Sequence, residues 1–215
     1  MYIIRLSVAF YFILLVYSNS ISCAENNYMH PIGCTEDNGR YIFELMRKHD
    51  NESLFEFVSS KIKECPDDID LRSLRSMIFI NKKMYKDALK DIDYILSKSP
   101  LDQGILIEKC LLNESIAPNN NRESHLLCYK NVSESIKSTN NDKSLFENDG
   151  IAYVLAVSMA EIPEAETIRK QYLDFLDTIA HDPSSIKYQE EKALVDLGRQ
   201  FFLHFDRKKF LYPPP

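Results

Sequence analysis

Apolar side chains recur along most of this chain at the spacing of an α-helix. Between residues 84 and 98 they follow steps of one, three and four residues, which places them on one helical face: Ala88, Leu89, Ile92, Ile95 and Leu96. The same spacing predicts further helices at 36–49, 51–64, 70–82, 103–115, 122–137 and 150–162, one after Pro163, and one at 184–205. No alternating pattern of useful length predicts a strand. We therefore expect an all-α fold of about nine helices.

Two features refine this expectation. Residues 150–162 are apolar on every side, which is typical of a helix buried in the centre of a fold. The chain has only 5 glycines in 215 residues, and an all-β fold with many tight turns would require more. Polar loops at 117–121 and 140–144 separate successive helices.

The apolar pattern also repeats at longer range. When residues 50–66 are shifted forward by 34 positions they fall on 84–100, and four pairs of matching residues align: Phe55 with Leu89, Val58 with Ile92, Ile62 with Leu96, and Pro66 with Pro100. A period of 34 residues that is closed by a proline is typical of stacked helical hairpins. A single hairpin cannot bury its own apolar face, so each one needs neighbours in the array.

Residues 69–102 resemble one unit of the tetratricopeptide repeat family. The matching positions are Ser76 and Phe79 in the first helix and Tyr85, Ala88, Ile92 and Pro100 in the second. The chain departs from the family where Arg72 replaces the usual Trp and Arg75 the usual Leu. The resemblance implies a solenoid of antiparallel hairpins over residues 35–207, although a simple helical bundle can imitate one such repeat. An N-terminal extension at 25–34 and an extended C-terminal tail at 208–215 would flank the array.

The first residues have the layout of a secretory signal. Arg5 precedes an apolar run at 8–17, and small residues lead to a cleavage point after Ala24. The run is too short to span a bilayer, so we expect residues 1–24 to be removed and the mature protein to be periplasmic or secreted. The alternative is a lipoprotein signal in which Cys23 becomes the lipidated N-terminus.

Four cysteines remain after that cleavage, and an oxidising compartment favours disulfides. Cys34 and Cys65 lie at equal distances from the predicted turn near residue 50, and Cys110 and Cys128 lie at equal distances from the turn near residue 119. Antiparallel helices bring such positions together, so we expect the pairs Cys34–Cys65 and Cys110–Cys128. The alternative is that these residues are buried free thiols.

The sequence contains no recognisable catalytic or metal-binding motif. None of the 5 histidines has a partner at metal-ligand spacing, and no phosphate-binding or nucleophile motif occurs. We therefore expect a non-catalytic protein without a cofactor or metal. The net charge is −6 and no basic run exceeds residues 207–209, which argues against a nucleic-acid partner and favours a basic protein partner.

The resemblance implies that a partner would contact the exposed side of first helices. Carried onto residues 69–102, those positions are Asp70, Ser73, Met77, Ile80 and Asn81. The aromatic C-terminal segment is a second candidate, through Phe202, Phe210 and Tyr212, because aromatic residues beside basic ones are common at interfaces. We expect Phe201 on the buried stripe of that segment instead. The alternatives are that Met77 and Ile80 are core residues and that the C-terminal helix only caps the array.

Two functions fit these observations. The first is an exported inhibitor of the immunity type, which neutralises a toxin or hydrolase in the periplasm. The second is an adaptor or assembly factor of an envelope or secretion complex. An inhibitor should bind one partner tightly, whereas an adaptor should bind several partners.

Overall fold

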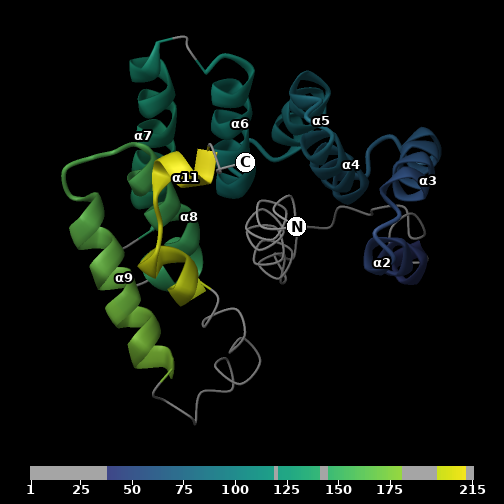
Figure 1. Cartoon of the computed structure of the whole chain (residues 1–215). Coiled ribbons are helices and arrows are strands. Elements are labelled where there is room, and N and C mark those ends of the chain that lie inside the picture. Colours follow the sequence, from purple (N-terminus) through teal and green to yellow (C-terminus); the bar gives the residue numbers. More distant parts are fainter. Residues whose placement is uncertain (1–37, 119–120, 141–144, 181–197, 212–215) are drawn as a thin grey trace. The chain divides into compact units, whose positions relative to one another are not determined.

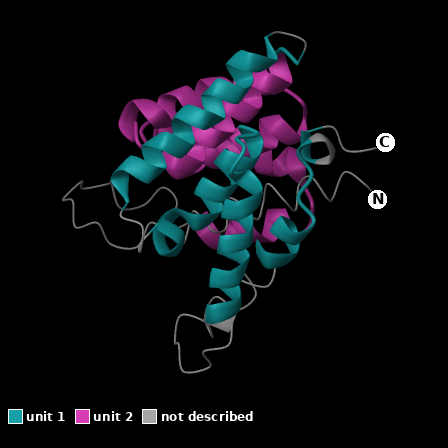
Figure 2. Ribbon diagram, turned by 90° about the vertical axis from the view of Figure 1, so that its left-hand side faces the viewer, with its two compact units in different colours: residues 1–22, 117–215 teal, residues 23–116 magenta. Residues whose placement is uncertain are grey.

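The computed structural model describes residues 38–118, 121–140, 145–180 and 198–211, and the regular elements in these ranges are all helices (Figure 1). The chain divides into two compact units between residues 116 and 117 (Figure 2). Unit 2 comprises residues 23–116, and unit 1 comprises residues 1–22 and 117–215. The predicted all-α class is confirmed, and the range 35–207 expected for the repeat domain includes residues of both units. The predicted signal peptide and N-terminal extension lie outside the described residues.

The described part of unit 2, residues 38–116, contains five helices that follow one another as antiparallel neighbours. They are α2 (Gly39–Arg47), α3 (Asn51–Glu64), α4 (Ile69–Asn81), α5 (Tyr85–Lys98) and α6 (Gln103–Ile116). Each packs against the next one along the chain. The predicted helix at 51–64 has the bounds of α3, and the predictions for α4, α5 and α6 are within one residue at each end.

The 34-residue period is present in the backbone of unit 2 as well as in its sequence. Helices α3 and α5 begin at residues 51 and 85 and end at residues 64 and 98, so both bounds differ by 34. Helices α2 and α4 end in the same way: His49 and Lys83 have left-handed φ values of 57° and 59°. Their amide groups donate to the carbonyls of Met46 and Ile80, at 3.0 and 2.9 Å. These left-handed residues close both helices and turn the chain into the next one.

Aspartates begin three of these helices. Each side chain accepts a hydrogen bond from the backbone amide three residues later: Asp50 from Ser53 at 3.0 Å, Asp68 from Leu71 at 2.9 Å, and Asp102 from Ile105 at 3.0 Å. The bond from Ser53 lowers the pKa of Asp50. Asp68 and Asp102 are again 34 residues apart. The starts of α3, α4 and α6 are therefore stabilised by contacts within the same segment of the chain, independently of packing between helices.

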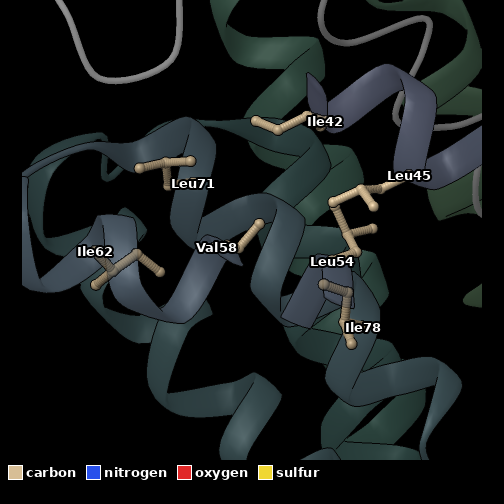
Figure 3. Packing of buried hydrophobic residues seen from close by; sticks show 7 residues of the cluster. All are labelled: Ile42, Leu45, Leu54, Val58, Ile62, Leu71 and Ile78. Atoms are coloured by element: carbon tan, nitrogen blue, oxygen red, sulfur yellow. The ribbon is translucent and has the colours of Figure 1, made fainter. Parts of the chain in front are cut away.

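Two apolar clusters form the core of unit 2, and α4 contributes to both. The first joins α2, α3 and α4 through Ile42, Leu45, Leu54, Val58, Ile62, Leu71 and Ile78 (Figure 3). The second joins α4, α5 and α6 through Phe79, Ala88, Ile92, Ile95, Ile105 and Leu112. Because α4 supplies side chains to both clusters, neither hairpin can lose it without exposing apolar surface.

Unit 1 contains α7 (Arg122–Thr139), α8 (Leu145–Met159), α9 (Ala165–Ala180), a helical stretch at 198–203, and α11 (Arg207–Leu211). Helix α8 packs against both α7 and α9. Every residue from 152 to 157 is buried, which confirms that this apolar stretch is a central helix. Helix α8 begins five residues earlier than predicted, with a non-helical φ of −128° at Asp149.

The C-terminal segment differs from the extended tail that the sequence suggested at 208–215, because residues 207–211 form α11. The guanidinium of Arg207 donates from Nε to the carbonyl oxygen of Met159, the last residue of α8, at 2.9 Å. A cation at this position satisfies a carbonyl that the helix leaves unpaired and complements the dipole of α8. Arg169 of α9 donates to the carbonyl of Phe205 at 3.3 Å. These long-range bonds hold the segment against α8 and α9.

Three cysteines are disulfide-bonded in the structure: Cys65, Cys110 and Cys128. Both members of the predicted pair Cys110–Cys128 are therefore in the oxidised form. Cys34, the predicted partner of Cys65, lies outside the described residues.

Mapping of peptides without reduction should link residue 34 with 65 and residue 110 with 128. A link between residue 34 and either 110 or 128 would contradict the hairpin symmetry.

Helices α8 and α9 lie close together at Gly150. A Cβ atom at this position would lie 2.4 Å from Cε2 of Tyr172. The Tyr172 ring cannot easily move away, since it is 4% exposed and lies between Phe146 and Phe202, with ring centroids 5.4 and 5.5 Å away. The absence of a side chain at residue 150 therefore lets the two helices pack closely.

We predict that Gly150→Ala lowers the free energy of unfolding by about 1–3 kcal/mol, because the added methyl group overpacks the contact with Tyr172. Chemical denaturation monitored by circular dichroism measures the change. Gly39→Ala is the matched control, because nothing lies within 4 Å of the Cβ atom it would add. Equal stability of the two variants would show that α8 and α9 are not in close contact at residue 150.

Candidate functional site

Three sides of α4 are committed to packing within unit 2. Leu71, Leu74 and Ile78 face the first core cluster. Arg72, Arg75 and Phe79 face α5, and Ser76 contacts Glu108 of α6. Ile69 and Ile80 pack against the second core cluster. At 100° per residue, the other four positions of α4 lie together on the fourth side: Asp70, Ser73, Met77 and Asn81. Asp70 and Asn81 are exposed, and Ser73 and Met77 are half-buried.

Four of the five residues predicted on this helix therefore share one face. The fifth, Ile80, packs against the second core cluster, and its half-buried side chain is a core residue at the edge of that face. This is the alternative that the sequence left open for Ile80. Met77 is the apolar residue at the centre of the fourth side.

The 34-residue period adds one residue that the sequence reasoning missed. Phe43 of α2 lies 34 positions before Met77, and its side chain is 65% exposed. Leu111 of α6 lies 34 positions after Met77 and is 5% exposed. Equivalent positions on three successive first helices are thus apolar, and the exposure falls from α2 to α6. The repeat itself was the signal that could have identified Phe43.

A buried carboxylate fixes the opposite side of α4. Asp91 of α5 is 1% exposed, and Arg75 donates to its two oxygens from Nε at 2.7 Å and from Nη2 at 2.6 Å. Arg72 donates to Oδ1 of Asp91 from Nη1 at 3.2 Å. The hydrogen bonds to Asp91 raise the pKa of Arg75. Arg72 and Arg75 are therefore both partners of one acidic residue.

Arg72 also ties the start of α4 to the end of α5. Its Nε and Nη2 donate to the carbonyl of Pro66 at 3.0 and 2.8 Å, and its guanidinium stacks on the ring of Tyr94 at 3.6 Å. The Tyr94 hydroxyl donates to Asp67, which also pairs with Lys98 at 3.1 Å. The bonds from Tyr94 and Lys98 lower the pKa of Asp67. The Tyr94 ring thus provides the aromatic face on which the planar guanidinium of Arg72 stacks.

The C-terminal candidates are placed differently from the expectation. Phe202 is fully buried, with its ring centroid 5.5 Å from that of Tyr172, so its predicted exposure is wrong. Phe201, which was expected to be buried, is half-buried. The helical stripe is therefore displaced by one residue, because the long-range contact with Tyr172 selects Phe202. Phe210 is half-buried and contacts Phe201 and Phe205, and Tyr212 lies outside the described residues.

The described residues show neither a metal site nor a membrane-spanning helix. No group of three or more His, Cys, Asp or Glu side chains in these ranges could hold a metal ion. None of the helices in the part of the chain that the structure describes has the length and apolarity needed to cross a membrane. Comparisons with models of protein families, with curated proteins and with solved structures find no match. The candidate site is the α2–α4 surface, which we define as the fourth side of α4 (Asp70, Ser73, Met77 and Asn81) together with Phe43 of α2.

We predict that Asp91→Ala lowers the free energy of unfolding by about 3 kcal/mol, because it leaves two arginines without their buried counter-ion. Asp93→Ala is the matched control on the same helix. Asp93 is exposed and pairs with Lys109 at 2.7 Å, so its loss should cost less than about 1 kcal/mol. Chemical denaturation compares the variants. An equal effect of the two replacements would show that the Asp91 cluster does not stabilise unit 2.

Proposed function

We propose that this chain is an exported, non-catalytic protein-binding helical-repeat protein of the tetratricopeptide type. A single observation carries the proposal. Phe43 and Met77 occupy equivalent positions on successive first helices, on the side of α4 that the core and the Asp91 cluster leave unused. An apolar side chain that is 65% exposed, as Phe43 is, favours contact with another molecule when it belongs to an ordered row.

The residues beside this row indicate the kind of partner. Arg47 of α2 and Asn81 of α4 are also 34 residues apart, and both are exposed. The apolar row is thus bordered by a polar row that can donate hydrogen bonds. A segment of another protein would suit this surface if it carried one or two apolar anchors and hydrogen-bonding groups beside them.

Within this class we propose the inhibitor role first. A protein whose activity is only to bind needs a rigid surface, and the buried Asp91 cluster supplies rigidity in unit 2. Neutralising a toxin or hydrolase in the periplasm would follow from tight binding to one target. The alternative is an adaptor of an envelope or secretion complex, which would use the same surface for several partners.

We predict that Phe43→Asp and Met77→Asp each weaken partner binding at least about thirtyfold, or about 2 kcal/mol, because a carboxylate would be buried against an apolar anchor. The partner is first captured from the native source with the mature protein and identified by mass spectrometry. Titration calorimetry of the purified pair then measures the affinity. The melting temperature of both variants should change little.

Leu127→Asp is the matched control, because Leu127 is 54% exposed but lies on α7 of unit 1. It should bind the partner like the wild type. If all three variants bind equally well, the partner docks elsewhere. If Met77→Asp unfolds the protein, Met77 is a core residue and the proposed surface is wrong. Loss of the partner's own activity at a one-to-one ratio separates an inhibitor from an adaptor.

A further inference from the structure

Glu108 is a carboxyl group that the proposed binding surface does not use. It lies on α6, is 4% exposed, and contacts the hydroxyl of Ser76 on α4, with 3.3 Å between Oε1 and Oγ. None of the ion pairs of the described residues includes Glu108. A buried ionised carboxylate without a cation would be strongly destabilising. The question is therefore whether Glu108 is ionised or neutral in the folded protein.

The hydrogen bonds of the Ser76 hydroxyl indicate the protonation state of Glu108. The hydroxyl oxygen lies 2.8 Å from the carbonyl oxygen of Ser73, which can only accept a hydrogen bond. A serine hydroxyl has a single proton, so it cannot serve the Ser73 carbonyl and the Glu108 carboxyl fully at the same time, and the Ser73 carbonyl is the nearer acceptor. If Glu108 is a neutral acid, its own proton can be donated to the Ser76 oxygen, and both contacts are then satisfied.

The charged groups nearby do not favour the ionised form either. On α4, Arg72 and Arg75 bind Asp91, and on α5, Asp93 pairs with Lys109. Burial raises the pKa of Glu108 to about 8. A hydrogen bond donated by Ser76 would oppose this rise in pKa, and the negative charge of Asp102 adds to it.

We propose that Glu108 is a proton-dependent lock between α4 and α6: as a neutral acid it donates to Ser76, and its ionisation loosens the contact between these helices. The folded protein then holds a proton that the unfolded chain releases above its ordinary pKa of 4.5. The contribution of Glu108 to stability is therefore fully present below pH 4.5 and is lost as the pH rises towards about 8. Ser76 precedes Met77, so loosening α4 would also alter the proposed binding surface, a consequence that rests on the proposed function.

Two measurements on the full mature protein test the lock without any partner. The first follows the side-chain carboxyl carbon of Glu108 by NMR in wild-type protein between pH 5 and pH 9. We expect the chemical shift of a protonated carboxyl at pH 6 and a transition well above the pKa of an exposed glutamate. A Glu108 carboxyl that is already ionised at pH 6 would overturn the proposal, and this result does not depend on a variant that folds.

The second measurement is the folding equilibrium constant as a function of pH, from urea denaturation. Between about pH 5 and pH 8, wild-type protein should lose up to about tenfold per pH unit more than Glu108→Gln, which keeps a neutral hydrogen-bond donor. If Glu108→Gln keeps the wild-type slope, Glu108 is not the lock.

Discussion

The pairing of Asp91 with Arg72 and Arg75 is the interaction on which unit 2 depends. A carboxylate that is 1% exposed is stable only beside cations that are held in place, and both arginines lie on α4. The pair therefore fixes how α4 rotates against α5. Once that rotation is set, Leu71 and Ile78 face the first core cluster, Ser76 meets Glu108, and Met77 faces away from both.

The rotation of α4 explains how packing and function share one helix. Ridges of apolar side chains alone allow neighbouring rotations of similar energy, whereas a bidentate contact between a guanidinium and a carboxylate does not. At residues 72 and 75 charged side chains hold α4 and α5 together, so specificity of packing in this hairpin arises from ion pairing.

The sequence predicted unit 2 well because its signals are local. Helix α3 has the predicted bounds because Asp50 caps its start, and the 34-residue period recurs in α5. Signals between distant residues were not readable. The two adjacent aromatics Phe201 and Phe202 have equal burial tendencies, and only Tyr172 decides which one is buried. The Asp91 cluster joins residues 16 and 19 positions apart, which no helical period reveals.

The central functional claim is that α2 and α4 carry the binding surface. Hydrogen–deuterium exchange of the protein with and without its partner tests this claim most directly. The account predicts that the partner slows exchange in peptides from α2 and α4, at residues 39–47 and 69–81, while peptides from α9 are unchanged. Slower exchange confined to unit 1, with α2 and α4 unaffected, would contradict the assignment of binding to the first helices of unit 2.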